Sequence, residues 1–259
     1  MIRVVDVTQH YSVKPVLKGI NLEFPEGSTT VIIGPNGMGK TTLLSVMAGT
    51  LSPQKGYVEI NGLVRRSTAE DEIAIRKQCV YLPDRCWLPK EYTGREFLAA
   101  VGQLYEIEIN RLLGHAERLV KLFNLTEIAD SPIRTYSAGQ QKKISLCSAL
   151  ITECPILLLD EPFSGGLDPA GIMALKQLLQ SFTRDQKRTV VLTTPVPELV
   201  AEVADRLVVI NQGEVLAEGA ITDFVQQAGP GATLADALQT LVFPETTDHL
   251  AAYLSEDES

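Results

Sequence analysis

The sequence predicts an α/β fold with a mainly parallel sheet, joined by an N-terminal antiparallel β subdomain and a helical subdomain. Three observations lead to this prediction. A β-branched, apolar strand over residues 29–33 runs into a glycine-rich loop and then a helix. From Pro155 onward, apolar strands alternate with amphipathic helices, as in a parallel sheet covered on both faces. Between them, about residues 87–150 carry only helical periodicity.

Short β-rich segments surround the glycine-rich loop in the N-terminal part of the chain. Strands are expected over residues 3–7, 20–24, 29–33 and 57–60. Turns are expected at residues 25–27 and 61–62, where Pro-Glu-Gly and Asn-Gly interrupt the apolar pattern. The helix after the loop should cover residues 41–48 and end at Gly49. These segments predict the antiparallel subdomain.

The helical stretch begins with a capping signal. Thr93 and Glu96 have the spacing of a capping box. Apolar residues follow at helical spacing in two runs: Phe97, Leu98, Val101, Leu104 and Tyr105, then Leu112, Leu113, Ala116, Leu119, Val120 and Phe123. Both runs predict core packing.

The C-terminal half predicts the parallel sheet and its helices. Strands are expected over residues 156–159, 189–193 and 207–210, and helices over residues 170–182 and near residues 197–204. The turn at residues 211–214 predicts an antiparallel hairpin. We therefore expect one large domain over residues 1–230, with its helical subdomain at about 87–150. Residues 231–259 are expected to form a small helical appendage with an acidic tail.

Composition and charge limit the classes of function. The net charge of −9 argues against a nucleic-acid-binding surface. The four Cys lack C-x-x-C spacing and the three His are scattered, so reduced thiols are expected rather than a metal cluster. No apolar run reaches the ~18–20 residues of a membrane span, and the N-terminus lacks the pattern of a signal peptide. A cytosolic protein is expected.

Residues 34–42 carry the strongest chemical signal. Their sequence, GPNGMGKTT, matches G-x-x-x-x-G-K-[ST], the phosphate-binding P-loop, and it lies between a strand and a helix as that motif requires. The glycines let backbone N–H groups face one anion, and Lys40 adds a positive charge near the β- and γ-phosphates. The Thr41 hydroxyl is placed to ligate Mg²⁺. The candidate nucleotide-binding residues of the loop are Gly34, Asn36, Gly37, Gly39, Lys40, Thr41 and Thr42. The sequence thus predicts a P-loop NTPase core.

Two carboxylates end the apolar strand after Pro155. A P-loop protein needs an acid at the end of a neighbouring strand to hold Mg²⁺, and Asp160 fits that position. Glu161 would then face the γ-phosphate, where it could polarise an attacking water as a general base. Without the P-loop, either acid could instead cap the following helix.

A second anion-binding signal precedes that strand. Ser137, Ala138, Gly139 and Gln140 open a helix with a hydroxyl and bare N–H groups, which alone indicates no more than a helix N-cap. In this order before the acidic strand, however, the set resembles the ATP-binding-cassette (ABC) ATPase family. Residues 137–140 are similar to its Ser-Gly-Gly-Gln signature, with one Gly replaced by Ala138. The resemblance covers about residues 2–219 and implies that the nucleotide is ATP, bound with Mg²⁺.

The resemblance assigns roles to matching positions. It implies that Tyr11 stacks on adenine, although a plain strand aromatic is the alternative. The signature residues Ser137, Gly139 and Gln140 would contact the γ-phosphate held by an opposite subunit, so that two chains clamp two ATP molecules head to tail. Asp168 is similar to the acid that links the two sites across such a dimer.

Transporters of this family dock a membrane partner between the P-loop and the signature, the segment that includes residues 87–89 of this chain. Residues 95–98 and 102–105 resemble the drug, polysaccharide and lipid exporter branch of bacterial ABC ATPases, and residues 233–238 resemble a short segment at the end of that branch. The resemblance therefore implies a peripheral protein on the cytoplasmic face of the membrane with an integral membrane permease as its partner.

Three departures from the family pattern, besides Ala138, bear on the chemistry. Asp84 stands where the family usually has Gln, and its carboxylate is a candidate Mg²⁺ ligand that adds negative charge beside a triphosphate. Pro195 stands where the family has a His that contacts the γ-phosphate, and Thr194 could compensate in part. The loop at residues 162–167 is one residue longer than usual, so Asp168 could be displaced.

These departures predict an ATPase that binds ATP normally but hydrolyses it slowly. The expected function is the ATP-hydrolysing subunit of an ABC transporter that works as an exporter, as a homodimer or as a heterodimer with another ABC ATPase. Two alternatives stay open: a soluble ABC ATPase with an assembly or repair role, and a nucleotide-binding switch with little hydrolysis.

Overall fold

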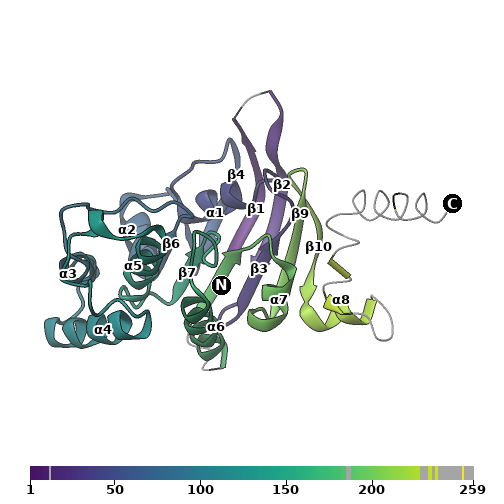
Figure 1. The fold of residues 1–259 in the computed structure, drawn as a ribbon. Helices are drawn as coiled ribbons and strands as arrows, with labels where there is room; N and C mark the ends of the chain where they lie inside the picture. Colours follow the sequence, from purple (N-terminus) through teal and green to yellow (C-terminus); the bar gives the residue numbers. More distant parts are fainter. Residues whose placement is uncertain (12, 185–187, 228–232, 235–236, 239–252, 254–259) are drawn as a thin grey trace.

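Two sheets and a set of helices make up the computed structural model, which describes the chain except for residues 12, 185–187, 228–232, 235–236, 239–252 and 254–259 (Figure 1). The N-terminal sheet has the order β2-β1-β4-β5 with antiparallel neighbours. Its strands are β1 (Ile2–His10), β2 (Pro15–Phe24), β4 (Lys55–Ile60) and β5 (Leu63–Val64).

The central sheet has the order β10-β9-β3-β8-β7-β6, and its strands are parallel except for β10. Its strands are β3 (Thr29–Ile33), β6 (Cys79–Leu82), β7 (Ile156–Leu159), β8 (Thr189–Thr193), β9 (Arg206–Asn211) and β10 (Glu214–Ala220). The predicted fold class is confirmed, and so is the antiparallel hairpin after β9.

The helices of the described residues cover both faces of the central sheet and extend beyond one of its edges. They are α1 (Lys40–Ala48), α2 (Ala69–Gln78), α3 (Gly94–Leu104), α4 (Ile109–Leu122), the 3₁₀ turn η1 (Ile133–Thr135), α5 (Ala138–Leu150), α6 (Pro169–Arg184), α7 (Pro197–Val203) and α8 (Ile221–Gln227). Helices α3 and α4 pack on each other and on α5, at the end of the molecule opposite β10 (Figure 1).

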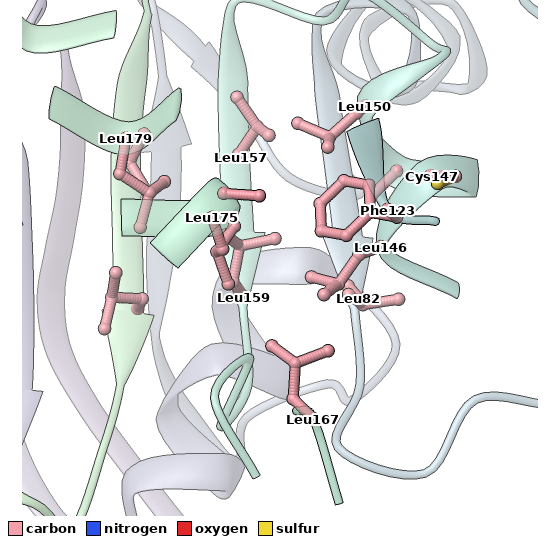
Figure 2. Close-up of a cluster of buried hydrophobic side chains, with 14 of the residues drawn as sticks. Leu82, Phe123, Leu146, Cys147, Leu150, Leu157, Leu159, Leu167, Leu175 and Leu179 are labelled. Atoms are coloured by element: carbon pink, nitrogen blue, oxygen red, sulfur yellow. The ribbon is translucent and has the colours of Figure 1, made fainter. Parts of the chain in front are cut away.

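The inner strands β3, β7 and β8 of the central sheet are buried at every position, and β7 is apolar throughout. In β7, Leu157 and Leu159 face a cluster formed with α5 and α6, which Figure 2 shows around Phe123 and Leu175. The intervening residues Ile156 and Leu158 face a second cluster with α1 and the N-terminal sheet. This double burial fixes the strand register, since a shift by one residue would exchange the two faces. Because β3, β8 and β7 run parallel to one another, their carboxyl ends meet along one edge of the sheet.

The predictions for the helical stretch are confirmed at the start of α3 and wrong for the burial of two leucines. The Thr93 capping box is present, because Thr93 N–H donates to Glu96 Oε2 at 2.8 Å and Glu96 N–H donates to Thr93 Oγ1 at 3.2 Å. The prediction of core packing is wrong for Leu104, which is 82% exposed, and for Leu113, which is 54% exposed. Both lie in apolar runs, but at positions that turn away from the packed faces of α3 and α4.

The sequence patterns gave no signal for α2, which buries only Ile75. Its start is nevertheless marked by polar residues, since Thr68 Oγ1 accepts a hydrogen bond from Asp71 N at 3.0 Å. Most of the expected C-terminal appendage, residues 231–259, lies outside the described residues, as does part of segment 233–238.

Burial in the central sheet predicts a large difference between two identical substitutions. Leu157→Ala removes a fully buried side chain from β7, whereas Leu104→Ala removes a largely exposed one from α3. We expect Leu157→Ala to lower the free energy of unfolding by about 2–5 kcal/mol and Leu104→Ala by less than about 0.5 kcal/mol. Urea unfolding followed by circular dichroism measures both. Equal losses would contradict the packing described above.

Candidate nucleotide-binding site

The loop between β3 and α1 is held in a curved form by close backbone contacts. A Cβ on Gly34 would lie 2.0 Å from the carbonyl oxygen of Ile210 in β9. Gly39 has φ 106° and forms the N-cap of α1, and a Cβ there would lie 2.8 Å from the Val16 carbonyl oxygen. No side chain caps α1, so its first N–H groups are open toward the loop. The curved loop and helix start together form an anion-binding surface.

Lys40 lies inside this loop with its amine turned back onto the backbone. Its Nζ donates hydrogen bonds to the carbonyl oxygens of Gly34 and Pro35, at 2.7 and 2.9 Å. Burial lowers the pKa of the Lys40 ammonium, and the charges of Glu161 and Asp160 oppose part of that shift. The loop therefore holds a desolvated positive charge at its centre, which strengthens attraction to a phosphate.

Asp160 follows β7 directly and lies against the start of α1. Its Oδ1 accepts hydrogen bonds from Thr193 Oγ1 at 2.6 Å and from Thr41 Oγ1 at 3.2 Å. The residue is only 1% exposed, and its Oδ2 is buried without a hydrogen-bond partner among the described residues. A buried, unpartnered carboxylate oxygen beside a threonine hydroxyl is an arrangement that a divalent cation satisfies. The site thus fits Mg²⁺.

Glu161 occupies a strained turn after Asp160. Its φ is 44°, in the left-handed region, and its N–H donates to Thr193 Oγ1 at 2.9 Å. Burial and then the charge of Asp84 raise the pKa of the Glu161 carboxyl, while Lys40 and Lys142 oppose that shift. Thr193, which the sequence analysis took only as the end of a strand, thus holds both carboxylate residues in place.

A cavity of about 350 Å³ opens over these groups. It is lined by Tyr11, Val16, Asn36, Gly37, Gly39, Lys40, Thr41, Thr42 and Glu161. All of these except Val16 are predicted site residues, and Gly34 lies behind the loop against Ile210. The Tyr11 hydroxyl is 3.5 Å from Thr42 Oγ1, and its ring is exposed. The structure therefore brings together an aromatic ring, an anion-binding loop, a lysine and a carboxylate around one cavity.

Residues 137–140 form the start of α5 and do not line this cavity. Ser137 Oγ accepts a hydrogen bond from Gln140 N at 3.3 Å, and Gln140 Oε1 accepts one from Ser137 N at 2.8 Å, so the two residues form a capping box. Ser137 and Ala138 are exposed. Gly139 packs so closely on the next loop that a Cβ would lie 2.5 Å from the Gly166 carbonyl oxygen.

Asp168 lies at the start of α6 and is tied to α5. Its Oδ2 accepts from Lys143 Nζ at 2.7 Å and its Oδ1 accepts from Gly171 N at 2.8 Å. The Lys143 hydrogen bond in particular holds the pKa of the Asp168 carboxyl below its usual range. The carboxylate is half exposed, so it is fixed in place while still open to an approaching surface.

Comparison with known proteins agrees with this geometry. The family model described as ABC transporter matches residues 17–164, more than half of the chain. The chain belongs to the ABC transporter family. It is an ABC ATPase, with the P-loop and both strand-end carboxylates of the cassette assembled as described above.

Several ABC proteins resemble the chain over most of its length. It is 33% identical over 85% of its length to the daunorubicin resistance ATP-binding protein DrrA3 of Streptomyces coeruleorubidus, 68% of which is covered. It is 27% identical over 96% of its length to the ATP-binding protein EcsA of Bacillus subtilis (strain 168), 99% of which is covered. The cobalt import ATP-binding protein CbiO of Salmonella typhi is 32% identical over 85% of this chain and 81% of its own length.

Solved structures agree as well. An ATP-binding subunit of an ABC transporter superposes with a TM-score of 0.82 and 28% identity, covering 93% of this chain and 99% of the other. A dimeric ATP-binding cassette in a post-hydrolysis state, bound to ADP and Pi, superposes with a TM-score of 0.77 and 26% identity over 85% and 98% of the two chains. These likenesses confirm an ABC ATPase fold.

The three departures of this ABC cassette have distinct structural settings. Asp84 does not line the cavity; its Oδ1 accepts from Ser164 Oγ at 2.7 Å and lies 3.4 Å from Lys142 Nζ. Pro195 follows β8, and the neighbouring Thr194 is buried, with its Oγ1 accepting from Val196 N at 3.1 Å. The Thr194 oxygen thus acts as an acceptor within its own turn, and Thr194 is not among the residues that line the cavity.

The longer loop contains two successive glycines in the left-handed region, Gly165 at φ 79° and Gly166 at φ 82°. They let the chain reverse beside Gly139. The predicted displacement of Asp168 stays a prediction.

Proposed function

We propose that this chain is the ATP-hydrolysing subunit of an exporter, in which ATP-gated dimerisation drives a separate membrane permease. The observation that carries the hydrolytic part is that Lys40, Thr41 and Glu161 line one cavity, with the buried Asp160 hydrogen-bonded to Thr41. In this proposal, residues 1–230 form the ATPase domain and residues 231–259 an appendage to it.

Each residue of the group has a role that follows from its position. Thr41 and Asp160 would hold Mg²⁺, which supplies charge neutralisation at the phosphate oxygens when it is bound. Lys40 and the N–H groups of residues 34–42 bind the phosphates, and Tyr11 offers a face for the adenine base. Glu161 orients a water molecule and accepts its proton. The role of Asp84 as a further Mg²⁺ ligand stays a prediction.

The exposed start of α5 supports a dimer. The capping box uses the N–H groups of Ser137 and Gln140, so residues 137–140 present the Ser137 hydroxyl and the N–H groups of Ala138 and Gly139, yet they lie outside the cavity of their own chain. They would contact the γ-phosphate bound by a second cassette, while Asp168 links the two sites. A homodimer and a heterodimer both satisfy this geometry. Sedimentation velocity with and without MgATP tests it, since the proposal requires association that depends on ATP.

The export direction rests on relatives, and the contact with a permease rests on one exposed aromatic side chain. DrrA3 is named for daunorubicin resistance, although CbiO is named for cobalt import. Trp87 is 81% exposed in the segment before α3 and would contact the permease. Among the helices of the described residues, none has the length and apolar character to cross a bilayer. We place the chain on the cytoplasmic face of the cell membrane, bound through that partner.

A detergent-solubilised pull-down of the tagged chain from its native host tests the transport role. A stoichiometric integral membrane protein is the expected result. Recovery of soluble partners alone would favour the assembly or repair role instead.

A second candidate, a nucleotide-binding switch with little hydrolysis, is favoured by Pro195. Proline has no side-chain donor and no N–H, and the neighbouring Thr194 is buried and does not line the cavity. If a contact from position 195 to the γ-phosphate is missing in the transition state, Pro195→His should restore it. The variant should then raise kcat about 10–100-fold at pH 7, the equivalent of one charge-assisted hydrogen bond. Phosphate release under saturating ATP measures the effect. An unchanged kcat would show that Pro195 does not limit the rate.

A further inference from the structure

A charged pair connects the loop after β6 with α5. Lys142 Nζ lies 3.4 Å from Asp84 Oδ1 and 3.4 Å from the Asp84 carbonyl oxygen. The Lys142 side chain is only 6% exposed, whereas the Asp84 side chain is 41% exposed. The pair therefore consists of a buried ammonium and a carboxylate that reaches the protein surface.

The buried ammonium needs this carboxylate. Removing one partner of a buried ion pair leaves an uncompensated charge, which destabilises the local structure strongly. Among the described residues, both oxygens within hydrogen-bonding distance of Lys142 Nζ belong to Asp84. The stem of Lys142 passes Gly165, where a Cβ would lie 3.4 Å from its Cδ. Because the Lys142 side chain is buried, it has little room to turn toward another partner.

The same carboxylate is connected to the turn that carries Glu161. Ser164 Oγ lies 2.7 Å from Asp84 Oδ1 and 2.8 Å from the Glu161 carbonyl oxygen, and Ser164 N donates to that carbonyl at 3.1 Å. The Glu161 turn is strained, with φ 44°, and persists only if surrounding contacts hold it. A continuous set of polar contacts therefore runs from α5 through Asp84 and Ser164 to the backbone of Glu161.

We propose that Lys142 is a positioning residue that acts through Asp84, holding the Glu161 turn in a fixed relation to the start of α5. The pair couples residues 137–140, at the start of α5, to the Glu161 carboxylate within one chain. It also gives Asp84 protein partners, which separates this role from that of a Mg²⁺ ligand. The inference rests on the ATPase function proposed above.

A double-mutant cycle in the full chain tests the pair. Asp84→Asn and Lys142→Gln should each lower kcat about tenfold, within the coupling range of residues in contact, while KM for ATP changes less than about twofold. The double variant should return to within about threefold of the wild-type kcat, because it leaves no unpaired charge and an amide at position 84 can still accept from Ser164. Lys121→Gln, at an exposed lysine of α4, is the matched control and should change neither parameter.

Three results would overturn the inference. Losses that multiply in the double variant would show that the residues act independently. A shift of the half-saturating Mg²⁺ concentration in Asp84→Asn, with none in Lys142→Gln, would make Asp84 a metal ligand. Coupled losses in urea-unfolding free energy with unchanged kcat would reduce the pair to a stabilising role.

Failure of the proposed ATPase function can be told apart from failure of this inference, because the wild-type chain itself would then release no phosphate. In that case the pair is judged by ATP-dependent association of the same variants, measured by sedimentation velocity. Recovery of association in the double variant supports the positioning of α5, and multiplied losses contradict it.

Discussion

Glu161→Gln is expected to lower kcat for ATP hydrolysis by about 10²–10⁴-fold, the range associated with loss of a general base. The amide keeps the size of the carboxylate but cannot accept a proton from the attacking water. The turn itself should survive, because its hydrogen bonds to Thr193 and Ser164 use the backbone of residue 161. Because the turn survives and only one charge near the cavity is lost, the Kd for ATP should change by less than about threefold.

Steady-state phosphate release and equilibrium binding of a fluorescent ATP analogue measure the two quantities separately. Glu198→Gln, at an exposed position in the first turn of α7, is the matched control and should match the wild type. The raised pKa of Glu161 adds a pH signature. Glu161 becomes protonated and can no longer act as a base as the pH falls through that pKa. The wild-type kcat should therefore decline at a pH above the pKa of an ordinary glutamate. The residual rate of the variant should lack this decline, and a variant with unchanged kcat would remove Glu161 from the mechanism.

The cavity was largely predictable because its parts are local. Lys40 and Thr41 belong to one loop whose glycine spacing fixes its shape, and Asp160 and Glu161 end a neighbouring apolar strand. Parallel strands place their carboxyl ends along one edge, so strand order alone brings these groups together. Thr193 was missed because a threonine ending a β-branched strand is equally typical of a plain core strand.

The features that the sequence patterns did not predict, or predicted wrongly, depend on how distant segments pack in the folded chain. Asp84 and Lys142 are 58 positions apart, and neither residue carries a local signal that the other will be its partner. Leu104 and Leu113 follow helical periodicity, yet that pattern does not say how wide a face the neighbouring helix covers. Trp87 has no periodicity at all, and its exposure is a property of the folded surface. The residues of the nucleotide-binding cavity were therefore more predictable from the sequence than the exposure of individual side chains.

Lys40→Met is expected to raise the Kd for ATP by about 10²–10⁴-fold. Methionine retains most of the stem but removes the ammonium, and charge-assisted contacts to two phosphates contribute about 1.5–3 kcal/mol each. The carbonyl oxygens of Gly34 and Pro35 also lose their donor, so some loss of stability accompanies the loss of affinity. Urea unfolding without nucleotide measures that part alone. Lys55→Met, at an exposed lysine of β4, should leave affinity unchanged.

The pair of variants separates the hydrolytic subunit from the switch. An enzyme that uses both residues loses turnover in Glu161→Gln and loses binding, and hence ATP-dependent association, in Lys40→Met. A switch that hydrolyses little ATP would keep its slow rate in Glu161→Gln, because no proton transfer limits it, yet would still lose association in Lys40→Met. Retained affinity in Lys40→Met would contradict both, since the buried ammonium would then make no contact with the phosphates.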